Sequence, residues 1–244
     1  MKNVLSNRGR ALCLDWLGQS PLLAFDFDGT LAPIVSDPSA AKLAVTTAAL
    51  LAELSQRRCC IVVSGRSRED VKRRLVGIPL AEVVGNHGSE PWLSPDVLAK
   101  EVAARLAPLR AALAAFSGVV LEDKGMSLSV HYRHAIDRRS VIQSSHAAAH
   151  SLGFEQIVAG KYVINLIPKG GMTKGSGLIR TMRELEKTCA IYVGDDVTDE
   201  SIFQLSAESA VLGIRVGHMR KSAAMLYIKK QTDIDSLLRL LLSQ

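Results

Sequence analysis

Leu22-Leu23-Ala24-Phe25-Asp26-Phe27-Asp28-Gly29-Thr30 is the stretch that decides the fold. Its four leading apolar residues are typical of a buried strand in a parallel sheet, and the glycine ends the pattern. Asp26 and Asp28 therefore follow the carboxyl end of the strand, where open α/β sheets bind their ligands. Residues two apart on an extended chain point the same way, and two such carboxylates repel unless a cation or a shared proton intervenes. We predict that this loop holds a divalent cation and carries out carboxylate chemistry.

The composition is that of a globular protein with a moderate positive charge. The chain has 244 residues, enough for one large or two modest domains, and 48% of them are hydrophobic. The net charge of +6 suits either nucleic acid or a small anionic substrate. Because the basic residues are scattered and only 5% of residues are aromatic, we expect a small anion as the partner and no nucleic acid.

The cysteines and the hydropathy pattern exclude several classes of protein. Cys13, Cys59, Cys60 and Cys189 form no Cys-x-x-Cys pair, so we expect neither a zinc site nor a disulfide framework. The first residues lack the apolar core of a signal peptide, and no apolar run reaches the length of a membrane span. We therefore expect a cytoplasmic protein without a membrane partner. Its oligomeric state stays open.

Most of the chain alternates between apolar strand patterns and amphipathic helix patterns. The predicted elements are a helix at 11–17, a strand at 22–25, a helix at 41–57, a strand at 60–63, a helix from 67 to about 76 and a strand at 82–84, then a helix from 176 to about 187, a strand at 190–193, a helix ending near 205, strands at 210–212 and 214–216, and a helix at 233–242. Such alternation predicts a parallel, doubly wound sheet.

The pattern changes in the middle of the chain. The predicted elements there are a helix at 96–116 that Pro108 kinks or breaks, strands at 119–122 and 127–133, a helix at 137–152, and a hairpin of 156–159 and 162–167 around Gly160-Lys161. Polar and apolar residues alternate along 127–133, which favours an antiparallel strand with one buried face. We predict an inserted α+β domain at 93–167 within a core formed by 1–92 and 168–244.

Polar side chains follow the predicted core strands. They are Asp26 and Asp28, Ser64 with Gly65, and Asp195, Asp196 and Asp199, and Lys174 opens a helix after a glycine-rich turn. The carboxyl ends of parallel strands meet at one crevice, so these groups are expected to converge. Oxygen ligands without a histidine and cysteine cluster favour Mg²⁺ over zinc. One carboxylate can then attack a phosphate ester while the other transfers protons.

Each of these signals also has a simpler interpretation. An Asp-Gly pair after a strand is often only a turn, and Ser64-Gly65 is often only the entry to a helix. Lys174 alone is an ordinary surface charge, and His87 between glycines is an ordinary loop residue. What favours a site is that four independent signals fall at strand ends or helix starts of one α/β pattern.

The order of these signals resembles a known superfamily. Asp26-Phe27-Asp28-Gly29-Thr30, Ser64-Gly65-Arg66, Lys174 and Gly194-Asp195-Asp196-x-x-Asp199 are similar to the four motifs of the haloacid dehalogenase superfamily of phosphatases. The resemblance implies an α/β fold with a Rossmann-like parallel sheet core. It also implies a cap domain inserted between the second and third motifs, where the α+β segment falls.

A narrower resemblance is to the trehalose-6-phosphate phosphatase family, carried by residues 85–90, 122–133 and 194–200. It implies an Mg²⁺-dependent enzyme that hydrolyses trehalose 6-phosphate through an aspartyl phosphate. The resemblance implies that Asp26 is the nucleophile and Asp28 the general acid and base. It implies that the phosphate is bound by Ser64, Gly65 and Lys174, and that the metal is bound by Asp26, Asp195 and the backbone carbonyl of Asp28, with support from Asp196 and Asp199. The residues implied to reach or line the sugar site are Glu122, Lys124, His87, His131, Arg133 and Asn165.

One strand departs from the family pattern. Val163-Ile164-Asn165-Leu166-Ile167-Pro168 stands where the family usually reads Val-Ile-Glu-Leu-Arg-Pro. Asn165 lacks the charge-assisted hydrogen bonds that a glutamate offers to sugar hydroxyls. The sequence therefore keeps open a phosphatase for another sugar phosphate, such as sucrose phosphate. A non-catalytic sensor of anionic sugars is a further alternative, against which the presence of both Asp26 and Asp28 argues.

Overall fold

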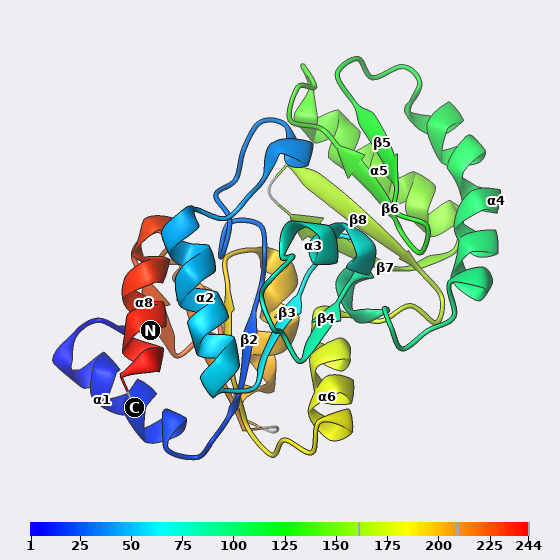
Figure 1. Ribbon diagram of the computed structural model, residues 1–244. Helices are drawn as coiled ribbons and strands as arrows, with labels where there is room; N and C mark the ends of the chain where they lie inside the picture. Colours follow the sequence, from blue (N-terminus) through cyan, green and yellow to red (C-terminus); the bar gives the residue numbers. More distant parts are fainter. Residues whose placement is uncertain (161, 208–209, 244) are drawn as a thin grey trace.

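Seven parallel strands form the larger sheet of the computed structural model, which describes residues 1–160, 162–207 and 210–243 (Figure 1). In spatial order the strands are β1 (Lys2–Asn3), β11 (Leu226–Ile228), β10 (Val211–Val216), β9 (Ala190–Gly194), β2 (Leu22–Phe25), β3 (Cys60–Val63) and β4 (Glu82–Val84). The strand predicted from the opening stretch, β2, lies between β9 and β3. It is buried along its whole length, as its uninterrupted apolar sequence predicts.

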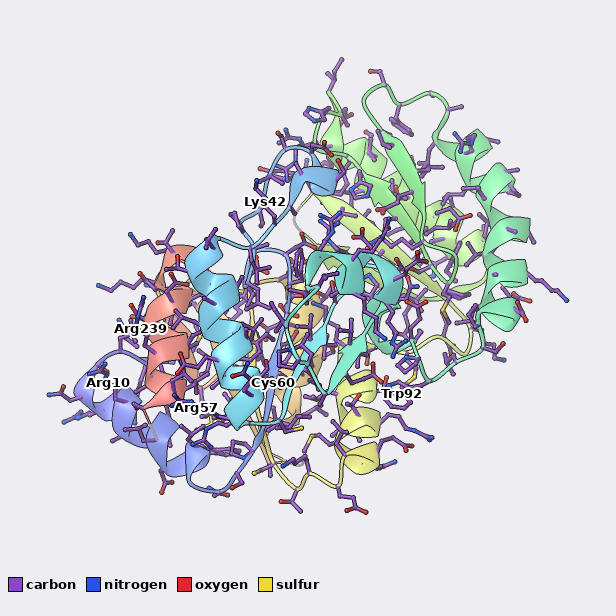
Figure 2. All side chains as sticks on the ribbon, viewed as in Figure 1. Arg10, Lys42, Arg57, Cys60, Trp92 and Arg239 are labelled. Atoms are coloured by element: carbon purple, nitrogen blue, oxygen red, sulfur yellow. The ribbon has the colours of Figure 1, made fainter. Side chains whose placement is uncertain are left out.

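Helices cover both faces of this sheet (Figure 1). One face packs against α1 (Asn7–Leu17), α2 (Val45–Arg57), α3 (Arg68–Arg74) and α8 (Ile234–Leu242), and the other against α6 (Lys174–Glu184) and α7 (Glu200–Phe203). Successive residues of β2 point to opposite layers, so Leu23 belongs to the first core and Leu22 to the second. Exposed arginines such as Arg10 and Arg239 lie on the outer surface of the helices (Figure 2).

A second sheet of four antiparallel strands lies beside the first and forms a cap (Figure 1). Its order is β5 (Val120–Asp123), β6 (Leu128–His131), β8 (Val163–Pro168) and β7 (Phe154–Gly160). The helices α4 (Pro95–Leu113) and α5 (Arg138–Ser151) pack on one face of this sheet, where Leu128 and Val130 join their apolar core. Among the described residues, no helix is long and apolar enough to cross a membrane.

The opposite face of the cap sheet carries a row of polar side chains. The antiparallel register pairs Glu122 with Ser129, and Ser129 with Asn165. Paired residues lie on the same face of a sheet, so these three side chains share the face away from the helices. The prediction that only one face of this strand is buried is wrong, because Ser129 is 0% exposed. Ser129 itself is covered by the surrounding protein, whereas Glu122 on the same face remains partly exposed.

The fold class is confirmed: a parallel α/β core carries a small antiparallel α+β cap. The division at residues 93 and 167 stays a prediction. Helix α4 runs through Pro108 without the break that was one expectation, and the two strands expected at 210–216 are the single strand β10. The short strands β1 and β11 were not predicted. The hairpin joins β7 to β8, and Lys161 lies outside the described residues.

The two connections between core and cap meet at one place. The chain enters the cap after the one-turn helix η2 (Asn86–Gly88) and returns just before α6. The backbone N–H of Met172 donates to Ser89 Oγ at 3.1 Å, which joins the two connections. Gly88 and Gly177 touch through their backbones, since a Cβ at Gly177 would lie 2.5 Å from the Cα of Gly88. This close approach places the start of α6 against the loop that follows β4.

The Gly177→Ala variant tests that contact. The added methyl group would meet backbone atoms that have no side-chain freedom, so we expect a loss of about 1–3 kcal/mol in the free energy of unfolding, measured by urea denaturation. Gly18→Ala at the end of α1 is the control, because its Cβ would lie 3.4 Å from the nearest atom in a helical conformation. We expect a change within about 0.5 kcal/mol there. Equal effects of the two substitutions would contradict the close approach.

Candidate active site

Four neighbouring strands bring the predicted residues to one edge of the parallel sheet. The strands β9, β2, β3 and β4 lie side by side and are followed by Asp195, Asp26, Ser64 and His87, respectively. A cavity of about 470 Å³ lies between this edge and the cap. Its lining includes Asp26, Asp28, Gly65, His87, Lys174, Asp195 and Asp196 from the core and Glu122, Lys124, His131, Arg133 and Asn165 from the cap.

A buried lysine joins the acidic groups at the base of the cavity. Lys174 is the first residue of α6, whose start is fixed by a capping box between Thr173 and Ser176. Its Nζ donates to Asp26 Oδ1 at 2.7 Å and to Asp199 Oδ1 at 2.8 Å. All three side chains are at most 5% exposed. Lys174 therefore bridges two carboxylates that follow different strands, Asp26 after β2 and Asp199 after β9.

Asp199 lies beneath the cavity rather than in its wall. Besides Lys174, it accepts a hydrogen bond from Tyr192 Oη at 2.6 Å and one from the backbone N–H of Asp196 at 2.8 Å. These contacts use both carboxylate oxygens of Asp199 and fix the carboxylate that binds Lys174. The role of Tyr192 was not predicted, because a tyrosine within a buried strand is an ordinary core residue.

The protonation equilibria reflect an excess of buried negative charge. Burial alone would lower the pKa of Lys174, but Asp199 and Asp26 outweigh it and raise the lysine pKa. Burial raises the pKa of Asp26 well above its ordinary value, and Asp199 and Asp195 add to this against the opposing effect of Lys174. Burial, Asp199 and Asp196 raise the pKa of Asp195 to about 7. One lysine does not neutralise this cluster.

The geometry of the acidic cluster fits a divalent cation. Oxygens of Asp26, Asp195 and Asp199 lie within 4.8 Å of one another. Among the described residues, Asp195 Oδ1 is buried without a hydrogen-bond partner. The Asp195 carboxylate lies against Gly29, where a Cβ would be 2.1 Å from Asp195 Oδ2 and φ is +81°. Glycine is required at this position for both reasons. Oxygen donors alone favour a hard cation.

A second buried cation holds the acidic loop from the side of β10. Arg215 is 5% exposed, and its guanidinium donates to the backbone carbonyls of Asp195 and Asp196. Glu200 accepts from the same guanidinium at 2.9 Å. Arg215 was not predicted as a site residue, although a charged residue inside an apolar run is a usable signal that it has a buried partner.

The loops after β3 and β4 bring a buried hydroxyl and a buried imidazole together. Ser64 is 1% exposed and accepts a hydrogen bond from the backbone N–H of Arg66 at 3.2 Å. His87 lies against Gly65, where a Cβ would be 2.6 Å from the imidazole Cε1. Burial, Lys124 and Lys174 lower the pKa of His87 well below its ordinary value, so the ring is neutral. Its Nε2 is buried and has no partner within the described part of the chain.

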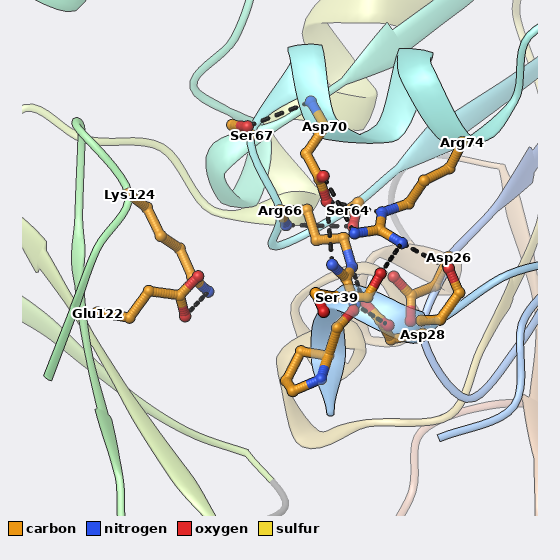
Figure 3. Close-up of polar contacts among 12 residues, drawn as sticks. Asp26, Asp28, Ser39, Ser64, Arg66, Ser67, Asp70, Arg74, Glu122 and Lys124 are labelled. Atoms are coloured by element: carbon orange, nitrogen blue, oxygen red, sulfur yellow. Dashed lines mark hydrogen bonds and ion pairs between the residues drawn. The ribbon is translucent and has the colours of Figure 1, made fainter. Parts of the chain in front are cut away.

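Asp28 is held by a side chain to which the sequence analysis assigned no role. Arg66 Nε donates to Asp28 Oδ2 at 2.6 Å, and Arg66 Nη2 donates to Asp28 Oδ1 at 2.7 Å (Figure 3). This is a bidentate pair of a guanidinium and a carboxylate. Arg66 follows Ser64-Gly65 directly, but neither its own position nor that of Asp28 indicates which charge it binds.

Charged side chains of the cap face the core across the cavity. Glu122 pairs with His131 at 2.7 Å and with Lys124 at 3.8 Å. Burial would raise the pKa of Glu122, but these two partners outweigh it and lower the pKa. Burial lowers the pKa of Lys124. Figure 3 shows Glu122 and Lys124 projecting from the cap toward the Asp28 and Arg66 pair.

The two remaining cap residues occupy different environments. Asn165 is 3% exposed, and its Oδ1 accepts a hydrogen bond from Ser129 at 2.8 Å. Its amide also contacts the carbonyl of Val158 at 3.4 Å. Arg133 lies at the rim and places its guanidinium over the ring of Tyr162, 5.2 Å from the ring centroid. Asn165 is therefore a fixed part of the cavity wall.

Asp195 predicts how stability depends on pH and on a divalent cation. Its pKa rises from 3.8 to about 7 on folding, so the folded protein retains a proton that the unfolded chain releases. This contribution to stability is complete below the lower value and is lost as the pH rises through about 7. Without divalent cations, Tm should fall between about pH 4 and about pH 7, and Mg²⁺ should restore most of it at the higher pH.

Asp195→Asn should flatten this pH trend and remove the Mg²⁺ response, as read by differential scanning fluorimetry. The control is Asp15→Asn on the exposed side of α1, which should behave like the parent protein. A full Mg²⁺ response in Asp195→Asn would contradict the assignment of Asp195 to the cation.

Sequence comparison relates the chain to enzymes that act on trehalose phosphate. The trehalose-phosphatase family model matches residues 24–230. The trehalose-phosphate phosphatase of Mycobacterium tuberculosis is 36% identical over 205 residues, which cover 78% of this chain and 52% of the relative. That of Mycobacterium avium is 34% identical over 219 residues, covering 82% and 54%, respectively. The chain thus spans about half the length of these curated relatives.

Solved structures show the same fold at lower identity. The C-terminal domain of Candida albicans trehalose-6-phosphate phosphatase aligns with a TM-score of 0.74 and 21% identity, covering 99% of this chain and 98% of that domain. The sucrose-phosphatase of Synechocystis aligns with a TM-score of 0.61 and 16% identity, covering 91% and 98%. The match of the family model over most of the chain, with mycobacterial relatives above one third identity, shows that this chain belongs to the trehalose-phosphatase family.

Proposed function

We propose that the protein is an Mg²⁺-dependent phosphatase that hydrolyses trehalose 6-phosphate to trehalose and phosphate. The observation that carries the proposal is Asp26, a buried carboxylate held by Lys174 at 2.7 Å where the cavity meets the carboxyl end of β2. Family membership supports the substrate class. The polar face of the cap across the cavity supports a ligand rich in hydroxyl groups.

In the first step, Asp26 attacks the phosphorus atom of the substrate. The bond between phosphorus and the sugar oxygen breaks, and the phosphoryl group becomes an aspartyl phosphate on Asp26. Asp28 enters this step in its protonated form and gives the proton to the departing sugar oxygen, so trehalose leaves as a neutral alcohol. Lys174 stays between Asp26 and Asp199 and orients the nucleophile, and its charge offsets that of the phosphoryl oxygens.

In the second step, water releases the phosphate. Asp28, now ionised, takes a proton from a water molecule that attacks the phosphorus atom, and the bond to Asp26 breaks. We assign the binding of phosphoryl oxygens to the hydroxyl of Ser64 and the backbone N–H of Gly65. When bound by the carboxylates of Asp26 and Asp195 and the carbonyl of Asp28, Mg²⁺ supplies positive charge that offsets the repulsion between nucleophile and phosphate.

Recognition of the sugar is assigned to the face of the cap and to one core side chain. Glu122, Lys124 and Asn165 present charged and amide groups to the cavity, and His131 and Arg133 extend this surface. The neutral ring of His87 has a free nitrogen that can bind a substrate oxygen. Asn165, where the family usually has glutamate, is the observation that favours another sugar phosphate as an alternative substrate.

Substitution of the nucleophile tests the proposal. Asp26→Asn should lower the release of phosphate from trehalose 6-phosphate by about 10⁴-fold or more, because amide nitrogen and oxygen are poor nucleophiles at phosphorus. Asp96→Asn, on the exposed first turn of α4, is the control and should retain full activity. Trehalose 6-phosphate, sucrose 6-phosphate and glucose 6-phosphate are compared with Mg²⁺ and with a chelator. Equal turnover of glucose 6-phosphate and the disaccharides would overturn the assignment to trehalose 6-phosphate.

Asn165 tests the assignment of the cap. Asn165→Glu exchanges a neutral hydrogen bond to a sugar hydroxyl for a charge-assisted one, so KM for trehalose 6-phosphate should fall about fivefold. KM for p-nitrophenyl phosphate, which has no sugar, should not change. If both KM and kcat for trehalose 6-phosphate are unchanged, Asn165 does not contact the sugar.

A further inference from the structure

Arg66 makes more polar contacts than its place beside the phosphate-binding loop requires. Its guanidinium binds both oxygens of Asp28, donates to Asp70 Oδ2 at 3.0 Å and donates to the carbonyl of Pro38 at 2.8 Å. Its side chain is 15% exposed. The rigid fork of arginine matches a carboxylate in a way that the point charge of lysine does not. The contacts fix both the position and the plane of the guanidinium.

The side chain of Asp28 is held by Arg66 and is otherwise more open to solvent than that of Asp26. Its side chain is 38% exposed, whereas that of Asp26 is 5% exposed. It also precedes Gly29, whose positive φ turns the chain away from the strand. Proton transfer requires the donor within hydrogen-bond reach of the leaving oxygen. A partly exposed carboxylate keeps this distance to the leaving oxygen when another group fixes its position.

Arg66 is also linked, through Asp70, to Arg74 at the end of α3. Asp70 accepts from Arg74 Nε at 2.8 Å, and Arg74 Nη1 donates to the carbonyl of Ser39 at 3.0 Å (Figure 3). Pro38, bound by Arg66, lines the cavity. The network therefore joins α3, the loop around Pro38 and the carboxylate of Asp28. Such a network is more than an isolated surface ion pair, because both arginines are only 15% exposed.

We propose that Arg66 is the positioning residue for the Asp28 carboxylate, and that Asp70 holds Arg66 in place. This inference rests on the proposed function, in which Asp28 transfers the protons. When one Asp28 oxygen turns to the substrate, the other stays bound to Arg66, since Asp70 and Pro38 continue to hold the guanidinium. Arg66 thus acts through Asp28 and does not itself contact the phosphoryl group.

A double-mutant cycle separates this role from direct binding of phosphate. Arg66→Gln should lower kcat on trehalose 6-phosphate by about 10²-fold with little change in KM, the cost of a misplaced catalytic group. In an Asp28→Asn background the same substitution should cause no further loss, because its only route of action is gone. Arg66→Lys should recover only part of the activity. An additive cycle would overturn the proposal.

A substrate whose leaving group needs no proton gives an independent test of whether Arg66 acts through Asp28. With p-nitrophenyl phosphate, the burst of p-nitrophenolate that reports formation of the aspartyl phosphate should be as fast in Arg66→Gln as in the parent. The steady-state rate should fall, because Asp28 must still activate water. A slower burst together with weaker inhibition by vanadate would mean that Arg66 binds the phosphoryl group, which contradicts the proposal.

Controls keep the experiment decisive. Arg73→Gln removes a neighbouring arginine that is 70% exposed and lies 3.4 Å from the same Asp70, and it should change neither kcat nor Tm. If Arg66→Gln does not fold, Asp70→Asn replaces it in the cycle and should show a smaller loss of kcat that also vanishes with Asp28→Asn. If the parent protein hydrolyses no phosphate monoester, the proposed function fails and the role of Arg66 with it. An active parent with an additive cycle removes only the role of Arg66.

Discussion

The contact of Lys174 with Asp26 and Asp199 is the interaction on which the site depends. Removing three charged groups from water costs several kcal/mol for each ion, and only close pairing offsets that cost. The lysine can reach both carboxylates because α6 starts beside Asp26, which directly follows β2, and Asp199, which comes after β9. The parallel order of the strands, the close approach of α6 to η2 and the acidic cluster thus form one arrangement.

The sequence alone predicted the parts of the fold that repeat a simple pattern. The strands β2, β3 and β9 are apolar along their length and end in charged or small residues, so both their burial and the direction of their ends were readable. The strands β1 and β11 have two and three residues, too few for a period to appear. The burial of Ser129 depends on the cap facing the core, which no local pattern encodes.

The residues of the site likewise fall into those that a sequence pattern predicts and those that it does not. Asp26, Lys174 and Asp195 stand at strand ends or a helix start, so topology alone brings them together. Arg66 and Arg215 have roles that depend on which carboxylate or carbonyl the fold places beside them, a relation between residues far apart in the chain. In the sequence Arg66 looks like a surface residue, and the apolar run around Arg215 indicates a buried partner without identifying it. Only the three-dimensional structure shows which groups these two arginines bind, in contrast to the exposed arginines of α1, α2 and α8 (Figure 2).

The meeting of the two core-to-cap connections has a consequence for how such proteins diversify. Ser89 and Met172 are hydrogen-bonded neighbours, although a whole sheet and two helices lie between them in the sequence. Both chain connections of the cap therefore lie at one place. An exchange of the segment between these two residues leaves every strand of the parallel sheet intact. The polar face of the cap can therefore change in evolution while the residues at the carboxyl ends of the parallel strands stay the same.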